Sequence, residues 1–158
     1  MPMIPLDAAD IRILSMLQRN GRLSNVELAE AVGLSPSPCL RRVKSLEEAG
    51  IISGYTVQLN QKKLGLGITA YVQVHMQRHN DSLTDSFKAA IKNEECVLSC
   101  YLMAGSCDFL MKVVAKDLDA YADFALKRLL KIEGVRDITS SFVLEMVKSP
   151  EILPLLER

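Results

Sequence analysis

A run of hydroxyl and basic side chains at residues 35–45 carries the clearest binding chemistry in this chain. The run reads Ser-Pro-Ser-Pro-Cys-Leu-Arg-Arg-Val-Lys-Ser. Guanidinium and ammonium groups bind phosphate oxygens and base edges, and hydroxyl groups bind the same partners. With Ser35 as N-cap, the two prolines occupy the first and third helical positions, whose N–H groups need no helical partner. The run is therefore predicted to begin a helix.

The predicted helix has a buried stripe and a polar outward face. Cys39, Val43 and Leu46 recur at helical spacing and form the stripe. The start of a helix has partial positive charge and N–H donors, which favour phosphate. The pattern thus predicts a helix that reads duplex DNA. We expect nine residues to contact the DNA: Ser24, Asn25, Ser35, Ser37, Pro38, Arg41, Arg42, Lys44 and Ser45.

The preceding segments supply the rest of a helix-turn-helix. Ser24 and Glu27 form an S-x-x-E capping box, and Gly33 is placed to end that helix. An earlier helix, with Asp7 as N-cap and Gly21 at its end, completes a trihelical DNA-binding core. A small helical bundle with an ordinary basic surface is the alternative interpretation of the same pattern.

Charge does not by itself identify a nucleic-acid partner. Residues 1–60 contain six Arg or Lys against six Asp or Glu, and the whole chain contains 19 of each sign, which leaves 13 of each for residues 61–158. Phosphate affinity must therefore come from the local cluster of Arg41, Arg42 and Lys44. A neutral DNA-binding head gains affinity when several heads act together, so we expect an oligomer.

Beyond residue 60 the hydrophobic period changes from 3.6 to 2. Residues 60–67 are polar and glycine-rich, which indicates a linker, and residues 55–59 are predicted to form a short strand just before it. The pattern then predicts strand 68–76, a helix opened by Ser82 and Asp85, strand 97–104, strand 109–115, a helix from Asp117 to Gly134, and strand 135–147. This β-α-β-β-α-β order is that of the ferredoxin-like sandwich.

The predicted fold class is α+β, with a winged-type helix-turn-helix followed by the ferredoxin-like domain. The expected boundaries are 1–52 for the head, 53–67 for the linker and 68–158 for the second domain. Both helices of the second domain should cover one face of its sheet. We expect the other face to carry Leu98, Leu102, Phe142 and Leu144 or their neighbours, an apolar surface that a dimer would bury.

Several classes of protein and site are not indicated. No apolar run approaches the roughly 20 residues that cross a bilayer, and the first residues lack the pattern of a signal peptide, so we expect a cytoplasmic protein without membrane contact. The four cysteines should then be thiols, with Cys96 and Cys100 packing as small hydrophobes. His75 and His79 fit a surface better than a metal pair. We expect no catalytic residue, no metal and no cofactor.

Two sequence features together resemble the Lrp/AsnC family of transcriptional regulators. The first is Gly21–Val43, reading GRLSNVELAEAVGLSPSPCLRRV, and the second is Gly105-Ser106-Cys107-Asp108-Phe109. The resemblance covers roughly residues 6–148. It implies a transcriptional regulator that forms dimers through RAM-type C-terminal domains. It also implies assembly into tetramers or octamers, with an amino acid or related metabolite bound between dimers.

The resemblance places the effector at the G-x-x-D turn. An amino acid presents an ammonium that suits Asp108 and a carboxylate that suits the backbone N–H groups around Gly105. The hydroxyls of the last strand alternate onto one face. The expected effector residues are Tyr101, Gly105, Ser106, Cys107, Asp108, Thr139 and Ser141. The family usually has an acidic or polar residue and then an aromatic between the glycine and the aspartate, where this chain has Ser-Cys.

Three alternatives stay open from the sequence. Asp108 is also suited to capping its own turn, and a pocket reshaped at Cys107 favours a DNA-architectural protein without an effector. A third alternative is an enzyme on the same scaffold, such as a tetrapyrrole decarboxylase. That chemistry needs basic and histidine side chains around a large pocket, and the intact surface of Ser37, Arg41 and Arg42 argues against it.

Overall fold

The computed structural model describes residues 5–77, 81–148 and 152–155. The chain divides into two compact units. The first comprises Met1–Gln58 with Lys148–Arg158, and the second comprises Leu59–Val147. We call them the helical unit and the sheet unit. No helix in the described ranges is both long and apolar enough to span a bilayer.

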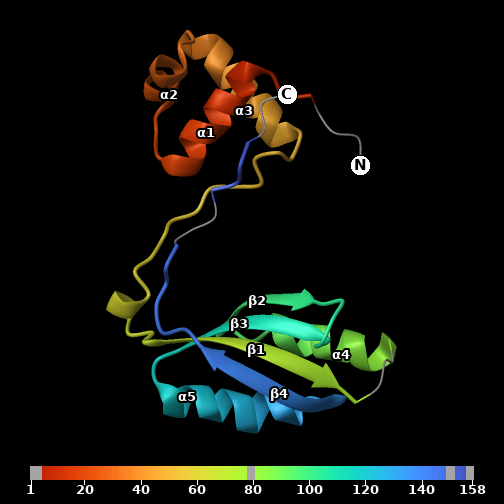
Figure 1. The fold of residues 1–158 in the computed structure, drawn as a ribbon. Helices are drawn as coiled ribbons and strands as arrows, with labels where there is room; N and C mark the ends of the chain where they lie inside the picture. Colours follow the sequence, from red (N-terminus) through yellow and green to blue (C-terminus); the bar gives the residue numbers. More distant parts are fainter. Residues whose placement is uncertain (1–4, 78–80, 149–151, 156–158) are drawn as a thin grey trace. The chain divides into compact units, whose positions relative to one another are not determined.

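The helical unit contains the three predicted helices, α1 (Ala8–Arg19), α2 (Asn25–Val32) and α3 (Pro36–Glu48) (Figure 1). Their ends follow the sequence signals. Asp7 and Asp10 form a capping box at the start of α1, and Ser24 with Glu27 forms the predicted one at the start of α2. Gly33 ends α2 in the left-handed conformation, with φ of 70°. The trihelical arrangement is confirmed.

The core of the helical unit brings one face of each helix together. Cys39 and Leu46 are buried as predicted, whereas Val43 is only half-buried at the edge. The buried residues of this core are Ile13, Leu14, Leu28, Ala29, Val32, Cys39 and Leu46. Burial raises the pKa of the Cys39 thiol, so this cysteine is a packing residue.

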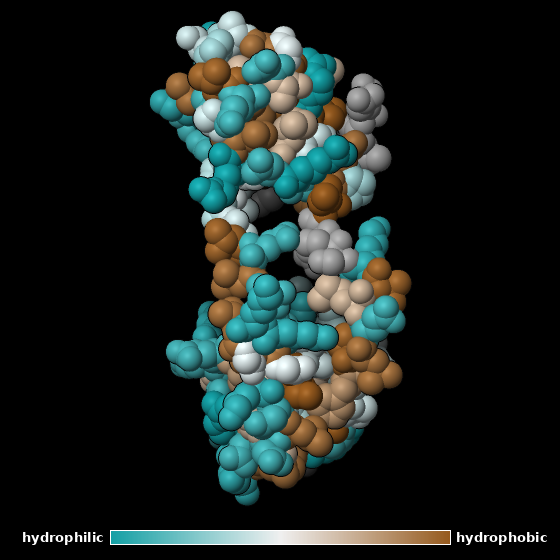
Figure 2. Space-filling model, turned by 90° about the vertical axis from the view of Figure 1, so that its left-hand side faces the viewer, coloured by the Kyte–Doolittle hydropathy of each residue, from teal (hydrophilic) through white to brown (hydrophobic). Residues whose placement is uncertain are grey.

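The predicted strand at residues 55–59 is not present. Residues 53–60 contain neither helix nor strand in the described structure, and Val57 and Leu59 are exposed. A strand requires a neighbour for its backbone N–H and C=O groups, and local side-chain alternation cannot supply one. Figure 2 shows apolar residues interspersed with polar ones on the viewed surface.

The sheet unit has the predicted element order. Its antiparallel sheet has the strand order β2-β3-β1-β4, which confirms the ferredoxin-like topology. A short 3₁₀ turn, η1 (Lys62–Leu64), precedes the sheet. The elements are β1 (Ile68–Met76), α4 (Asp81–Lys92), β2 (Val97–Leu102), β3 (Phe109–Ala115), α5 (Leu118–Asp123) and β4 (Val135–Phe142).

Helix α5 continues without a break into two irregular turns. The first is a π turn, η2 (Phe124–Arg128), and the second is a 3₁₀ turn, η3 (Leu129–Lys131). Asp117 caps the start of α5 by accepting the N–H of Ala120, as predicted. Both α4 and α5 pack on one face of the sheet, because their buried residues share a single core with the strands.

The composition of the open face of the sheet differs from the prediction. Leu102 lies opposite Phe109, and Phe142 lies opposite Ala70, so both belong to the face that the helices cover. The ring of Phe142 also meets that of Tyr121 in α5 edge-on, with centroids 5.0 Å apart. The expectation that Leu102 and Phe142 line the open face is therefore wrong.

The open face is mixed rather than apolar. Leu98 stands at a register irregularity in β2, and Leu144 lies beyond the end of β4. A shift of one residue moves a side chain to the opposite face, and sequence alternation alone does not locate such a shift. By register, the open face carries Tyr71, Gln73, Tyr101, Leu110, Lys112, Thr139 and Ser141.

The end of the chain groups with the helical unit. Leu155 packs against the helical core, and Leu153 is hydrogen-bonded to Gln18 of α1. The expected second domain, 68–158, thus differs from the observed division after residue 147. The cause is a contact between residues 135 positions apart, for which the sequence carries no local signal.

Candidate DNA-binding and effector sites

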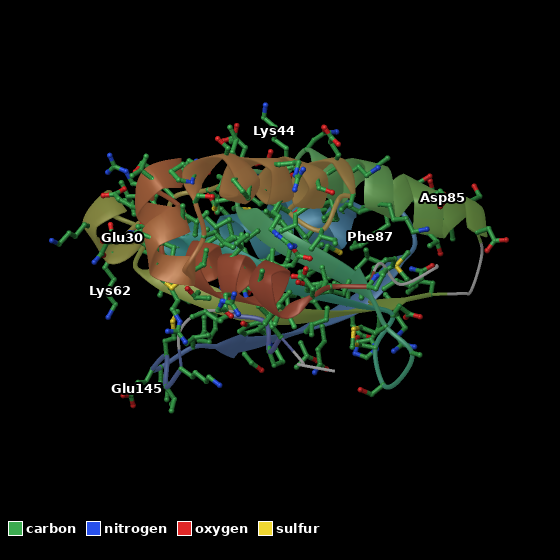
Figure 3. The ribbon with its side chains drawn as sticks, turned by 90° about the horizontal axis from the view of Figure 1, so that it is seen from above. Glu30, Lys44, Lys62, Asp85, Phe87 and Glu145 are labelled. Carbon is green, nitrogen blue, oxygen red and sulfur yellow. The ribbon has the colours of Figure 1, made fainter. Side chains whose placement is uncertain are left out.

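The outward face of α3 presents two cations to solvent. Arg41 and Lys44 are exposed, and neither forms an ion pair among the residues that the structure describes. They line a shallow hollow of about 530 Å³ with Ser37, Leu40, Ser45 and Glu48. Figure 3 shows Lys44 pointing outward from the helix. This face, which we call the α3 face, contains four of the nine predicted DNA contacts.

Arg42 has a different environment from its neighbour. Its Nη1 donates to Asp7 at 2.7 Å and to Asp10 at 2.8 Å, and its side chain is 34% exposed. The hydrogen bond to Asp10 and then that to Asp7 raise the pKa of Arg42, while the Asp10 N–H and then Arg42 hold the pKa of Asp7 below its ordinary value. Arg42 therefore ties α3 to the start of α1.

Asn25 also holds the helices together. Its side-chain nitrogen donates to the carbonyl of Pro36 at 2.8 Å, which links the start of α2 to the start of α3. Its side-chain oxygen is buried and has no hydrogen-bond partner in the described structure. Ser24 is occupied by its capping box, in which its N–H donates to Glu27 at 2.7 Å and lowers the pKa of that carboxyl.

The start of α3 offers few backbone donors. Ser35 occupies the N-cap without a side-chain capping bond, and Pro36 and Pro38 have no N–H. Among the first three helical residues, Ser37 alone therefore has a backbone N–H. The next N–H, that of Cys39, already donates to the Ser35 carbonyl at 3.2 Å. Affinity for phosphate at this end must therefore come mainly from side chains.

The predicted effector turn lies beside the end of β1. The turn and the strand enclose a hollow of about 530 Å³, which we call the turn hollow. Four predicted effector residues, at positions 105–108, belong to it. Its described lining comprises His75, Met76, Gln77, Met103, Ala104, Gly105, Ser106, Cys107, Asp108 and Arg136.

Asp108 connects the turn to the neighbouring strand. Its carboxylate accepts the N–H of Met76 at 2.7 Å, and its own N–H donates to the Val74 carbonyl at 3.0 Å. Its carbonyl accepts the Met103 N–H at 2.9 Å across the hairpin. The carboxylate thus holds the shape of the turn hollow, whatever further partner it takes.

The remaining predicted effector residues lie elsewhere on the sheet. Thr139 and Ser141 share a face, as predicted, and stand opposite Gln73 and Tyr71. Tyr101 lies on that same open face of β2. None of the three lines the turn hollow.

Sequence reasoning missed the polar residues that β1 and β4 bring to the hollow. Arg136 Nε donates to Asp137 at 2.6 Å, and His75 lies 3.8 Å from the same carboxylate. The pairing of His75 with Asp137 creates this group. The alternation of residues 68–76 indicated the face of His75, but no local signal indicated that its strand end meets the turn.

Family comparisons match both units. A model described as the Lrp/AsnC ligand binding domain matches residues 69–153, and one described as winged helix-turn-helix DNA-binding matches residues 6–53. The chain belongs to the Lrp/AsnC family. The α3 face therefore lies in the DNA-binding part of a family member, and the turn hollow lies in its ligand-binding part.

Individual relatives agree with this assignment. The leucine-responsive regulatory protein of Haemophilus influenzae is 41% identical over 95% of this chain and 90% of its own length. The protein of the same name from Escherichia coli K12 is 39% identical over 97% and 93%. These relatives are regulators by name, which favours a DNA-binding transcriptional regulator over the enzyme alternative.

Solved structures of this family superpose closely on the chain. A transcriptional regulator of Neisseria meningitidis, solved as an L-Met complex, has a TM-score of 0.92 and 44% identity, covering 95% of this chain and 97% of that one. An AsnC family regulator from Agrobacterium tumefaciens has a TM-score of 0.89 and 34% identity, covering 94% and 97%.

Proposed function

We propose that this protein regulates transcription in response to an amino acid bound in the turn hollow. The observation that carries the proposal is the 44% identity to a regulator solved with L-Met, combined with a hollow at the G-x-x-D turn. We further propose that it acts in the cytoplasm as a homodimer that assembles into tetramers or octamers. A second copy then completes the hollow.

The chemistry of the turn hollow suits a zwitterion with an apolar side chain. The guanidinium of Arg136 has donors beyond the one used for Asp137, and these fit a carboxylate. The Asp108 carboxylate, which accepts the Met76 N–H, has the negative charge that suits a ligand ammonium. The exposed side chain of Met103 in the lining suits an aliphatic or thioether side chain.

The α3 face is the proposed DNA-reading surface. Arg41 and Lys44 have no internal ion pair in the described ranges, whereas Arg42 is held by two carboxylates. We therefore assign base or phosphate contacts to Arg41, Lys44 and the neighbouring hydroxyls of Ser37 and Ser45. Two heads related by a dimer axis imply a roughly palindromic operator.

The proposal is tested by binding measurements on the full chain. Fluorescence anisotropy with a fragment from upstream of its own gene should show specific binding, and L-Met or L-Leu should change that affinity. L-Asp is the matched control, because its charged side chain does not suit a contact with Met103. Calorimetry that detects no amino acid at millimolar concentration would contradict the effector part.

The effector-independent DNA-architectural alternative has one observation in its favour. The Asp108 carboxylate already has a structural partner in the Met76 N–H. This alternative predicts strong DNA binding that no amino acid changes. The same anisotropy and calorimetry experiments therefore distinguish the two functions.

A further inference from the structure

Helix α1 binds the end of its own chain through one side-chain amide. The Gln18 Nε2 donates to the Leu153 carbonyl at 3.2 Å, and the Leu153 N–H donates to Gln18 Oε1 at 2.7 Å. The N–H and C=O groups of Leu153 are thus both hydrogen-bonded to the side-chain amide of Gln18. A neighbouring strand provides the same pair of bonds in a sheet.

The residues around Leu153 suit this contact. Leu155 packs against the helical core and is half-buried, although Leu153 itself remains exposed. Pro154 between them has no N–H, so it adds no unpaired donor. A residue before proline favours the extended conformation, which presents its N–H and C=O for such pairing. Residues 153–155, which we call the tail, therefore contact the helical unit in two ways. The Leu155 side chain is the apolar anchor, and the backbone of Leu153 forms two hydrogen bonds.

This non-covalent contact gives the helical unit a second link to the sheet unit, in addition to the chain that leaves it after Gln58. The chain leaves the helical unit after Gln58, forms the sheet unit, and returns from Lys148 onward. The returning segment follows β4, the strand that contributes Arg136 to the turn hollow, after the five residues 143–147. Ten residues, 143–152, separate the end of β4 from Leu153.

We propose that Gln18 and the Leu153–Leu155 tail form a latch that limits how far each DNA-binding head moves. With the tail docked, two chain segments restrain the helical unit, and with the tail released only the segment after Gln58 does. If the heads occupy a narrower range of positions, they lose less conformational entropy when they bind an operator. The docked tail therefore favours operators whose two half-sites have one fixed spacing. The consequence for DNA rests on the proposed function, whereas the docking itself does not.

Hydrogen exchange on the full chain tests the docking. Gln18→Ala keeps a strong helix former in α1 and removes both bonds, so the Leu153 amide should exchange about tenfold faster. The matched control is Arg19→Ala at the next residue of α1, which forms no hydrogen bond or ion pair with the tail among the described residues and should leave that amide unchanged. Leu155→Ala, which removes the apolar anchor, should have the same effect as Gln18→Ala.

The outcomes are distinct. Equal exchange rates of the Leu153 amide in the parent, in Gln18→Ala and in Leu155→Ala would overturn the docking. Protection that disappears on dilution to monomer would show that the tail of a second copy occupies the site and would overturn a latch within one chain. These outcomes do not depend on whether the protein binds DNA.

A DNA measurement tests the consequence. Gln18→Ala should weaken binding to a fragment with two half-sites several-fold and leave binding to a single half-site unchanged. An equal loss on both fragments would show damage to the head and refute the restraint. If the parent bound neither fragment, the proposed function would fail, while the exchange result would still decide the docking.

Discussion

Replacing Gly134 by alanine should destabilise the sheet unit by two additive effects. Gly134 has a φ of 88°, and a Cβ there would lie 3.1 Å from both the Leu83 Cβ and the Met76 Cε. The left-handed conformation costs a non-glycine residue roughly 1–2 kcal/mol. The Met76 methyl can move, but the Leu83 Cβ is fixed to α4, and such overpacking adds roughly 1–3 kcal/mol. We expect a loss of about 2–5 kcal/mol in the free energy of unfolding.

The matched control is Gly65→Ala in the same unit. Gly65 has a φ of 80°, but no atom lies within 4 Å of its added Cβ, so only the backbone cost of roughly 1–2 kcal/mol remains. Urea unfolding followed by tyrosine fluorescence measures both variants, because three of the four tyrosines (71, 101 and 121) belong to this unit. Equal losses for the two variants would refute the argument from the Leu83 contact.

Three further predictions concern the α3 face, the ion pairs of Arg42 and the turn hollow. Arg41→Ala should weaken specific DNA binding by roughly 1–3 kcal/mol, whereas Lys44→Ala should weaken binding to all sequences and flatten its salt dependence, both measured by anisotropy. Arg42→Met should leave the α3 face intact and lower the urea midpoint of the helical unit. The pKa of Asp7 is lowered in the folded state, so the ionised carboxylate stabilises the folded helical unit. This stabilisation is fully present above the unfolded pKa of Asp7 and is lost as the pH falls through the folded pKa. The Arg42→Met effect should therefore be larger at pH 7 than at pH 3, and an equal effect at both would contradict the ion-pair explanation. Asp108→Ala should abolish the effect of the amino acid on DNA binding and, because it removes a backbone partner, lower stability by roughly 1–3 kcal/mol, as checked by calorimetry and thermal melting.

Local signals in the sequence sufficed for the helices and their ends. The capping box of Ser24 and Glu27 and the left-handed Gly33 follow from residues close in sequence, and so does the helix that begins at Pro36. The element order of the sheet unit was also predictable, because each strand and helix has its own hydrophobic period.

Features that depend on distant partners were not predictable. Arg42 looks like its neighbour in the sequence, and only the approach of α1 gives it two carboxylates. The face on which Leu102 and Phe142 lie depends on strand register, which alternation does not determine when both faces contain apolar residues. The turn hollow gains Arg136 for the same reason, because β4 reaches it only through its pairing with β1.

The π turn after α5 bears on how this family can change in length. It places Phe124, Ala125 and Leu129 in the core while Leu126 between them is exposed. A π turn contains one residue more than the α-helical path between the same points. Deleting Leu126 would place Leu129 four positions after Phe124, which is an ordinary α-helical spacing, and would convert the turn into regular helix. We therefore expect a variant that lacks Leu126 to keep Phe124, Ala125 and Leu129 buried, so a change of one residue in length at this point preserves the core.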